Sequence, residues 1–372
     1  MPDVAIMIVG AGAAGLSAAG AMRKAGLDPV LLDRDSRIGG TWERRYDRLR
    51  LHTVRELSGL AHYPIPANEP RYMPRDRYAA YLCDYARHFD LKIIAGCAAR
   101  AIRPCEGGRW LVESDCGPWR ARAVVIATGQ YHEPVLPAWP GRELYHGALL
   151  HSHEYRNPEE YAGKRALVVG LGNSGAEIAA DLAEHGAAVA VAIRTPPPVV
   201  PRDPFGVPVQ RTGMLLSRLP TGLADRLGRL TARAVLGDLT RYGMPAPAWL
   251  PYATSSVPVI DVGFVAALKR GALALRPAVT RLTPEGAVFA DGSEGAFEVI
   301  IAATGYRSGL PGLLHVPGAL DERGEPAFPS GARTAFPGLY FIGYTHSLRG
   351  HLYEANRASR RLAPLVAEYL AL

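Results

Sequence analysis

Two glycine-rich stretches decide the fold of this chain: Gly10-Ala11-Gly12-Ala13-Ala14-Gly15 and Gly170-Leu171-Gly172-Asn173-Ser174-Gly175. A short apolar run precedes each stretch, and a run with helical character follows it. In such a loop the first glycine makes a tight turn after a strand, the second lets the backbone approach a pyrophosphate, and the third lets helix and strand pack closely. Free N–H groups at the start of the helix favour the anion. Two such loops predict two bound dinucleotides and hydride transfer between them.

The residues that end the next apolar runs distinguish the two sites. Asp33 ends the first run at a spacing from Gly10 that suits a carboxylate accepting a ribose hydroxyl, so the first site suits FAD or NAD. Arg194 ends the second run, and its guanidinium suits the 2′-phosphate of NADPH. The alternative for both residues is an ordinary solvated strand end.

Composition limits the class of protein. The 372 residues are enough for about two domains, and 48% hydrophobic with 21% charged residues is ordinary for a globular protein. The net charge is +7, but the arginines are scattered and no basic run is interleaved with aromatics, so we expect no nucleic-acid partner. No apolar run approaches the roughly 18 residues of a membrane span, so no membrane association is expected either.

The four cysteines, Cys83, Cys97, Cys105 and Cys116, form no C-x-x-C pair. Neither a redox dithiol nor a zinc site is therefore predicted, and no metal is expected. Free thiols of this kind are typical of a cytoplasmic protein.

The pattern of strands and helices predicts an α/β fold with two Rossmann-like dinucleotide-binding domains, each a sheet layered with helices. We assign 1–158 and 295–372 to an FAD-binding domain, and 159–294 to an NADPH-binding domain inserted into it. Strand-like runs ending in Ala-Thr-Gly occur twice, at 124–129 and 300–305, and residues 110–125 predict a hairpin that turns near Asp115. We further expect helices at 77–88, capped by Asp76, at 262–270, capped by Asp261, and from about 353 to 369.

Residues 196–258 form a proline-rich and helical insert within the second domain. The prolines of 196–208 predict irregular structure there. Residues 213–240 are helix-like, with an apolar stripe made of Leu216, Leu223, Leu227, Leu230 and Ala234. We expect a helical cap at the substrate entrance or an extra packing layer. Pro220 and Gly222 disfavour a membrane-surface helix.

Several motifs resemble those of class B flavin-dependent monooxygenases, in particular the YUCCA-like branch of the flavin-containing monooxygenase family. The resemblance covers nearly the whole chain and rests on Gly39-Gly40-Thr41-Trp42, Leu49-Arg50-Leu51-His52-Thr53, the stretch Tyr145 to Tyr155, and Gly172-Asn173-Ser174-Gly175-Ala176-Glu177. Tyr145 stands where the family has phenylalanine. The asparagine usual in the animal-type enzymes is absent near His52, which points to the YUCCA-like branch.

The resemblance implies an oxidoreductase in which NADPH reduces FAD, a flavin C4a-hydroperoxide forms with O2, and a small organic substrate is oxygenated at nitrogen, sulfur or a carbonyl or keto-acid carbon. The alternatives are an NADPH oxidase that releases peroxide and an FAD- and NADPH-dependent reductase that lacks a redox dithiol. The partners are then O2 and a small molecule, and the protein is a monomer or a homodimer.

The resemblance and the loops together give the candidate site residues. The FAD side comprises Gly10, Gly12, Ala14, Gly15, Asp33, Gly40, Thr41, Trp42, His52, Thr128, Gly129 and Gly343. The NADPH side comprises Gly170, Gly172, Asn173, Ser174, Gly175, Arg194, Thr304 and Gly305. The catalytic candidates are His52, Thr53, Arg349 and His351.

Two of these candidates, Arg349 and His351, and two further histidines, His346 and His151, each have two interpretations. Arg349 and His351, with His346, either approach the catalytic cavity or serve the start of the last helix and the FAD. His151 is either a general base or a hydrogen-bonded residue that fixes the linker between the domains.

Overall fold

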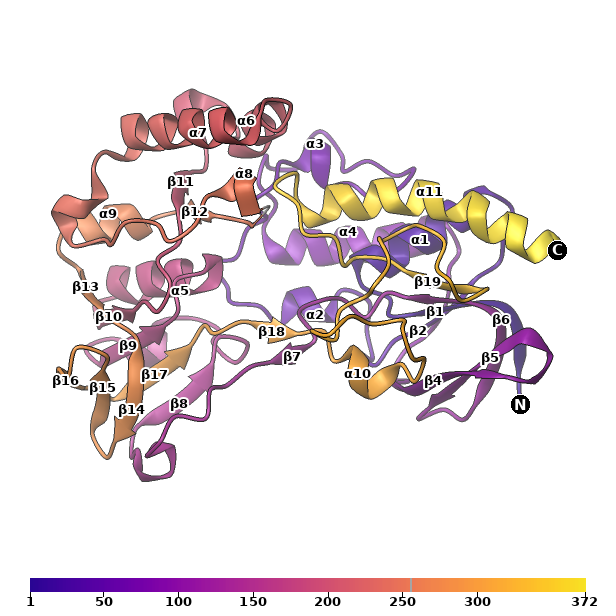
Figure 1. Ribbon diagram of the computed structural model, residues 1–372, viewed down its shortest axis with the longest axis horizontal. Coiled ribbons are helices and arrows are strands. Elements are labelled where there is room, and N and C mark those ends of the chain that lie inside the picture. The colour runs from indigo at the N-terminus through magenta and orange to yellow at the C-terminus, as the bar shows by residue number, and fades with distance from the viewer. Residues whose placement is uncertain (255) are drawn as a thin grey trace. The chain divides into compact units, whose positions relative to one another are not determined.

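The computed structural model describes residues 1–254 and 256–372; residue 255, which falls in the predicted insert, lies outside the described residues. The chain forms two compact units (Figure 1). The first comprises 1–44, 53–133 and 306–372, and the second comprises 45–52 and 134–305. Both are α/β units built around parallel strands, as the sequence predicts.

The first unit is a sheet in which parallel and antiparallel strands share β6. The parallel strands run in the order β3-β2-β1-β6, with β19 also pairing with β6. An antiparallel meander, β4-β5-β6, extends the sheet, and its β5–β6 turn is the hairpin expected near Asp115. The strands are β1 (Asp3–Val9), β2 (Val30–Leu32), β3 (Lys92–Ile94), β4 (Ala99–Cys105), β5 (Arg109–Ser114), β6 (Trp119–Ile126) and β19 (Leu339–Phe341).

Helices cover one face of this sheet, and α1 packs against both α4 and α11 (Figure 1). The contacts are close because small residues line them: Ser17 and Ser359 share a buried 2.8 Å hydrogen bond between α1 and α11. The other face carries an apolar cluster that includes Met7, Trp110 and Phe341. The helices of the unit are α1 (Ala13–Lys24), α2 (Gly40–Glu43), α3 (Arg55–Ser58), α4 (Arg75–His88), α10 (Leu310–Leu313) and α11 (His351–Ala371).

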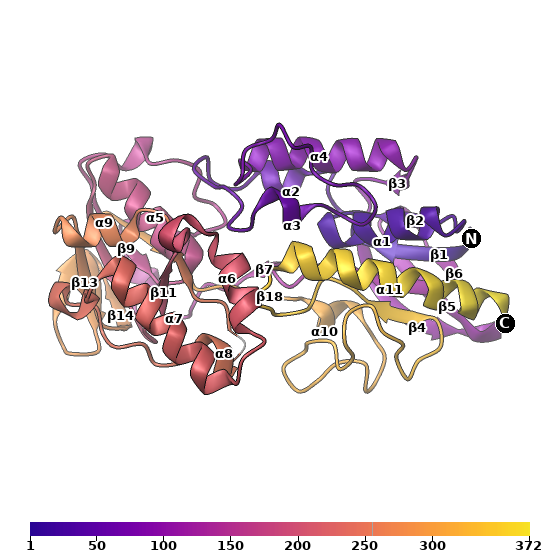
Figure 2. The ribbon, with the colours of Figure 1, turned by 90° about the horizontal axis from the view of Figure 1, so that it is seen from above.

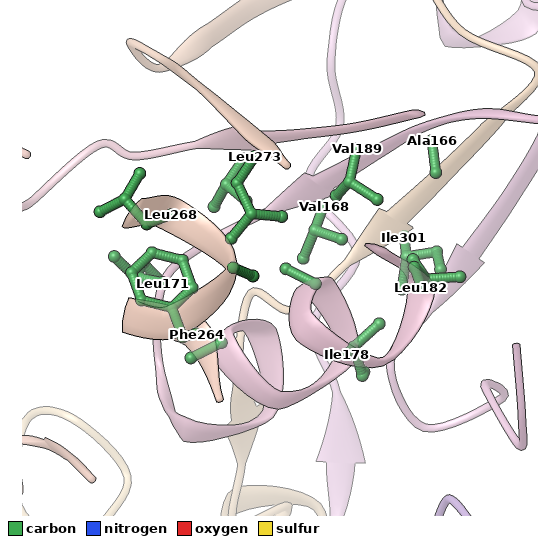
Figure 3. Packing of buried hydrophobic residues seen from close by; sticks show 14 of the residues in the cluster. Ala166, Val168, Leu171, Ile178, Leu182, Val189, Phe264, Leu268, Leu273 and Ile301 are labelled. Carbon is green, nitrogen blue, oxygen red and sulfur yellow. The ribbon is translucent and has the colours of Figure 1, made fainter. Parts of the chain in front are cut away.

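The second unit is an all-parallel sheet in the order β13-β10-β9-β17-β8. Figure 3 shows its core, in which Ile178 and Leu182 of α5 and Phe264 of α9 pack on the strands that carry Val168, Val189 and Ile301. The elements are β8 (Ala148–His151), β9 (Arg165–Val169), α5 (Asn173–Glu184), β10 (Ala188–Ala192), α9 (Phe264–Lys269), β13 (Leu273–Arg276) and β17 (Val299–Ala302). The antiparallel strands β14 (Val279–Thr283), β15 (Gly286–Phe289) and β16 (Glu294–Ala296) pack on the opposite face through Phe289 and Phe297.

The insert of the second unit is more regular than its prolines predict. Residues 199–201 form a short strand that pairs in parallel with β12, a correction to the irregular structure expected there. The helix-like run 213–240 is two helices separated by a turn that contains Pro220, because proline lacks the N–H needed inside a helix. The elements are β11 (Val199–Pro201), α6 (Val209–Leu216), α7 (Thr221–Leu236), α8 (Pro251–Thr254) and β12 (Val259–Asp261).

The boundaries between the two compact units differ from the predicted domain boundaries, 158/159 and 294/295. The second unit begins at 134 because β8 hydrogen-bonds to β17 as an edge strand of its sheet. It continues to 305 because β17 lies between β8 and β9. It also includes 45–52, a segment far earlier in the chain. The short strands β7 (Glu133–Pro134) and β18 (Tyr306–Arg307) lie where the chain passes between the units.

Helix ends differ slightly from the expectations. The helix predicted at 77–88 begins at Arg75, after Pro74, so Asp76 lies in the first turn rather than at the cap. The helix predicted at 262–270 is α9, which begins at Phe264 with Gly263 rather than Asp261 at its N-cap. The Asp261 carboxylate, at the end of β12, still accepts the Val265 N–H of the first turn at 2.9 Å. The last helix begins at His351 rather than at 353.

Candidate functional site

The first glycine loop, residues 10–15, has the geometry that its sequence predicts. Gly10 has φ +106°, and a Cβ at this position would lie 2.5 Å from the Ala127 carbonyl oxygen. A Cβ on Gly15 would lie 1.9 Å from the Gly10 carbonyl oxygen. A Cβ on Gly12 would meet open space, with no described atom within 4 Å. The turn and the packing thus require glycine at 10 and 15, whereas Gly12 leaves room for a ligand at the start of α1.

Asp33 closes this loop from the end of β2. Its carboxylate accepts the Ala11 N–H at 2.5 Å and the Asp35 N–H at 2.8 Å. Burial raises the pKa of Asp33, while these two backbone hydrogen bonds oppose the shift. The carboxylate is therefore held at the loop, where a ribose hydroxyl can hydrogen-bond to it.

The second glycine loop, residues 170–175, repeats the first almost atom for atom. Gly170 has φ +101°, and its Cβ would lie 2.5 Å from the Ala303 carbonyl oxygen. A Cβ on Gly175 would lie 2.0 Å from the Gly170 oxygen, and one on Gly172 would meet open space among the described atoms. In both loops the second glycine precedes the helix and no side chain caps it, so the N–H groups of the first turn stay available to an anion.

Two of the predicted NADPH-side residues, Asn173 and Thr304, use their side chains in hydrogen bonds to the protein backbone. The Asn173 side chain accepts the Ile260 N–H at 2.7 Å and donates to the Pro258 carbonyl at 3.2 Å, which fixes the approach to β12. The Thr304 hydroxyl donates to the Val135 carbonyl at 2.5 Å. Arg194, in contrast, is exposed after the end of β10, where a phosphate can reach it.

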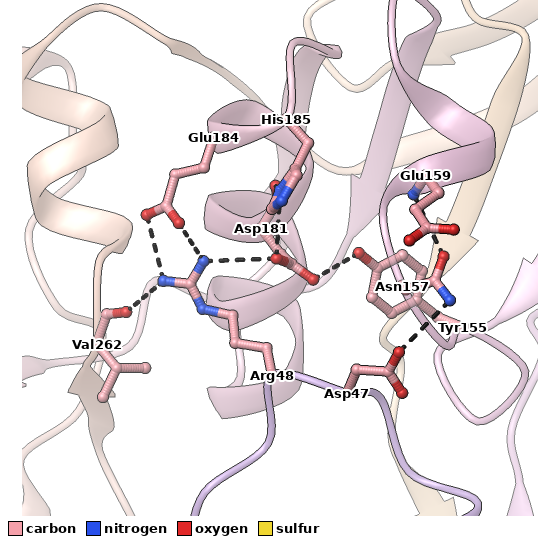
Figure 4. Close-up of polar contacts among 9 residues, drawn as sticks. All are labelled: Asp47, Arg48, Tyr155, Asn157, Glu159, Asp181, Glu184, His185 and Val262. Carbon is pink, nitrogen blue, oxygen red and sulfur yellow. Dashed lines mark hydrogen bonds and ion pairs between the residues drawn. The ribbon is translucent and has the colours of Figure 1, made fainter.

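Residues 45–52, here called the strap, cross helix α5 just beyond the loop (Figure 4). Arg48 donates to Glu184 at 2.5 Å and to the Val262 carbonyl at 2.9 Å, and it lies 3.6 Å from Asp181. Asp181, which is 5% exposed, also accepts the Tyr155 hydroxyl at 2.8 Å. A buried carboxylate needs such partners, and removing one partner of a buried ion pair costs about 3–5 kcal/mol.

Glu177 is the second buried acid that the strap covers. It is 3% exposed, and its Oε1 lies 2.6 Å from His52 Nε2. The Tyr46 hydroxyl hydrogen-bonds to Glu177 and to Ser174 of the loop; burial, and then the Glu177 carboxylate, raise the pKa of Tyr46. His52 and Ser174 are thereby joined through one hydrogen-bonded network at the start of α5.

A cavity of about 210 Å³ opens beside this network within the second unit. It is lined by Arg48, Arg50, His52, Glu177, Arg202 and Val262. Arg48 and Arg202 are paired with neighbouring carboxylates, so the exposed Arg50 is the guanidinium of this lining that can attract an anionic ligand. Arg48 is held by Glu184, and Arg202 is hydrogen-bonded to Asp203, whereas Arg50 is exposed. The sequence drew attention to Arg50 and His52 only through the resemblance; Arg202 and Glu177 were missed as cavity residues because they lie far apart along the chain.

The predicted FAD-side residues belong to the first unit, except His52, which lies in the second unit beside Glu177. A Cβ on Gly343 would lie 2.8 Å from Ala14, and Thr128 shares a 2.8 Å hydrogen bond with Tyr344; Gly129 follows Thr128 at φ +82°. Thr41 donates to Asp35 at 3.0 Å, and Gly40, Thr41 and Trp42 all lie in α2. Their contacts to FAD stay predictions.

The catalytic candidates are not gathered in one compact unit. Thr53 belongs to the first unit and shares a 2.7 Å hydrogen bond with Ser58, while His52 belongs to the second. Arg349 Nε lies 2.6 Å from Glu354 Oε1, which favours a role at the start of α11 over substrate binding. His351 Nδ1 donates to the Thr345 carbonyl at 3.0 Å, and burial lowers its pKa, so it is neutral at pH 7.

His151 fits the second of its two interpretations. Its Nε2 donates to the Gly305 carbonyl at 3.0 Å, and its Nδ1 accepts the His153 N–H at 3.1 Å. Both ring nitrogens are thus engaged with backbone at the end of β8, and burial lowers the pKa of the ring. These contacts favour the role of fixing the linker over that of a general base.

Comparisons with known proteins agree with this geometry. The model of the family described as flavin-binding monooxygenase-like matches residues 3–316. The chain belongs to this family. Indole-3-pyruvate monooxygenase YUCCA1 of Oryza sativa subsp. japonica is 37% identical over 350 residues, covering 91% of this chain and 86% of the relative. Indole-3-pyruvate monooxygenase YUCCA6 of Arabidopsis thaliana is 34% identical, covering 94% and 88%.

Solved structures extend the likeness to the whole chain. A flavin-containing monooxygenase from Stenotrophomonas maltophilia has a TM-score of 0.77 and 27% identity, covering 99% of each chain. A bacillithiol disulfide reductase from Staphylococcus aureus, at 16% identity and a TM-score of 0.72, shares the fold. The chain is therefore a class B flavin-dependent monooxygenase of the YUCCA branch, an oxidoreductase whose cofactors are FAD and NADPH. No helix of the described residues is long and apolar enough to cross a membrane.

Replacing Gly172 or Gly175 by alanine should have different effects, because the added methyl group meets different surroundings at the two positions. Gly172→Ala meets open space in the protein, so the chain should fold normally, but the methyl group takes the room of a pyrophosphate. We expect NADP⁺ affinity to fall by at least about tenfold, the equivalent of about 1.4 kcal/mol of lost phosphate contact. Gly175→Ala should instead destabilise the fold by about 1–3 kcal/mol or more, because its Cβ meets the Gly170 carbonyl.

Thermal unfolding and NADP⁺ titration separate these outcomes. Gly12→Ala is the matched control, since it has the same open surroundings in the first loop and should reduce FAD retention instead. Wild-type NADP⁺ affinity in Gly172→Ala would contradict the assignment of the second loop.

Proposed function

We propose that the protein catalyses the NADPH- and O2-dependent oxygenation of a 2-oxo acid of the indole-3-pyruvate type. The cationic cavity on α5 is the observation that carries the choice of substrate. The exposed Arg50 guanidinium of this cavity attracts a carboxylate and disfavours an amine that is protonated at neutral pH. The named activity of the plant relatives, indole-3-pyruvate monooxygenation, supports the same class.

The proposed reaction balances with these reactants: R–CO–COO⁻ + NADPH + H⁺ + O2 gives R–COO⁻ + CO2 + NADP⁺ + H2O. One oxygen atom of O2 forms a bond to the carbonyl carbon, the bond from that carbon to the carboxylate breaks, and the second oxygen atom leaves as water. The flavin, when bound, passes the two electrons of NADPH to O2. No proton-abstracting side chain is required at the substrate carbon.

The residues of the chain then have binding and orienting roles. The first loop and Asp33 hold the adenine half of FAD, and the second loop with Arg194 holds NADPH. Arg50 binds the substrate carboxylate, since Arg48 is already paired with Glu184 and His52 with Glu177. The strap supplies Arg50 and His52 together, so substrate and nucleotide are organised by the same helix.

The alternatives predict different products. A peroxide-releasing oxidase would consume NADPH without forming the shortened acid. A reductase that lacks a redox dithiol, the kind of reductase that the cysteine spacing allows, would oxidise NADPH and reduce its substrate without incorporating oxygen from O2.

Arg194 should determine the preference for NADPH over NADH. A charge-assisted contact to the 2′-phosphate is worth about 1.5–3 kcal/mol, so Arg194→Ala should raise KM for NADPH by about 10- to 150-fold and leave KM for NADH nearly unchanged. Steady-state kinetics with both nucleotides measure this. Arg142→Ala, an exposed arginine of the same unit outside the cavity, is the control. Equal effects on both nucleotides would refute the role.

Arg50 should determine the affinity for the 2-oxo acid. Arg50→Gln should raise KM for phenylpyruvate or indole-3-pyruvate by about tenfold or more, with KM for NADPH unchanged, because only the carboxylate contact is lost. The rate of NADPH oxidation and the yield of shortened acid are both followed, with Arg142→Gln as control. A rise in KM for NADPH alone would assign the cavity to a nucleotide phosphate. Efficient oxygenation of amines or thioethers, but not of 2-oxo acids, would overturn the proposed substrate.

A further inference from the structure

The apolar stripe of α7 faces solvent rather than a core. Leu223, Leu227 and Leu230 are 46%, 36% and 56% exposed, and Ala234 is exposed as well. At 3.6 residues per turn these positions share one side of the helix. Ala224, Asp225 and Leu236 are the buried residues of α7, and they lie away from the stripe. The helix thus packs on the unit through a different side from the one its leucines define.

Cations border this stripe. Arg226, Arg229 and Arg233 are exposed and project from one flank of α7. Arg211 and Arg218 come from α6 and the turn that follows it. Asp225 is 3% exposed and accepts the N–H groups of Tyr252 and Ala253 at 3.0 and 3.1 Å, and Asp238, just after α7, lies 3.5 Å from Arg233. The surface is therefore both apolar and positively charged.

Neighbouring segments add further exposed apolar groups. Leu215 of α6, which packs beside α7, is 63% exposed (Figures 1 and 2). Phe205 is 76% exposed and has φ +51°, a backbone conformation that costs free energy for an aromatic residue. Its short helical turn, Pro204–Gly206, also contacts α7. Aromatic and leucine side chains beside arginines are typical of helices that lie in a membrane interface.

We propose that α6 and α7 dock this protein reversibly on the surface of an anionic lipid bilayer. In this arrangement the leucines of α7 enter the boundary between headgroups and acyl chains, and Arg226 and Arg229 bind lipid phosphates. The helix is about 24 Å long and lies in the plane of the bilayer. The proposal replaces the expectation from Pro220 and Gly222. Pro220 separates Leu216, on α6, from the rest of the stripe, but both residues precede Leu223 and leave the stripe of α7 continuous from Leu223 to Ala234.

The charge of the α7 surface favours an anionic bilayer over the other ligands considered, a second copy of the chain and a nucleic acid. A two-fold contact with a second copy would place the same arginines against one another, on a chain whose net charge is already +7. A nucleic acid would match the arginines but would leave the leucines exposed. An anionic bilayer satisfies both the apolar stripe and its flanking cations.

Vesicle co-sedimentation of the FAD-loaded, full-length protein tests the proposal. We expect binding to vesicles of phosphatidylglycerol and phosphatidylcholine, weaker binding to phosphatidylcholine alone, and weakening by salt. Leu227→Glu combined with Leu230→Glu should weaken binding by at least about tenfold, because two apolar side chains are lost and two negative charges are added against an anionic surface. Arg226→Glu combined with Arg229→Glu should do the same. Leu144→Glu, which changes an equally exposed leucine elsewhere on the second unit, should bind as the wild type does.

Flavin content and circular dichroism verify that each variant is folded. Equal vesicle binding by wild type and by the Leu227 and Leu230 double variant would overturn the proposal. So would the absence of wild-type binding to the anionic vesicles. Size-exclusion chromatography tests whether the stripe binds a second copy of the chain. A wild-type dimer that the double leucine substitution converts to a monomer would assign the stripe to a dimer interface and contradict the proposed bilayer docking.

Discussion

The structure depends on one close contact that occurs twice, between the turn and the helix of each glycine loop. The carbonyl oxygens of Gly10 and Gly170 lie where the Cβ atoms of residues 15 and 175 would otherwise be. Only glycine allows a helix to start so near its preceding strand, and this start directs free N–H groups to a common point. Each parallel sheet is built around that strand, turn and helix, so both dinucleotide sites follow from the same steric constraint.

A second constraint is the need of the buried acids of α5 for hydrogen-bonding and charged partners, which the strap supplies. Glu177 and Asp181 are buried acids, and they require the cations and hydroxyls that residues 45–52 and Tyr155 supply. Satisfying these acids places Arg50 and His52 beside the helix that begins at the second loop. A segment from the first part of the chain therefore completes the second unit, and its charge sets the kind of ligand that the cavity favours.

Short sequence patterns predicted the features of the fold that depend on residues close together in the chain. The two glycine loops and the β5–β6 hairpin follow from glycine geometry and from alternation, and both agree with the structure, whereas α9 has Gly263 rather than Asp261 at its N-cap. Features that depend on contacts between distant segments were not predictable in this way. The second unit begins at 134 because β8 pairs with β17, and it includes the strap because Arg48 binds Glu184. The α7 stripe has the period of a core helix, yet it faces solvent, since periodicity gives a face but not its direction.

The central claim is that two bound dinucleotides serve oxygen insertion into a 2-oxo acid. The most direct measurement is turnover of phenylpyruvate under ¹⁸O2, with mass spectrometry of the acid product and parallel assays of NADPH and hydrogen peroxide. The account predicts one ¹⁸O atom in each molecule of shortened acid and one NADPH consumed per product. Consumption of NADPH matched by hydrogen peroxide, with no label in any organic product, would contradict it.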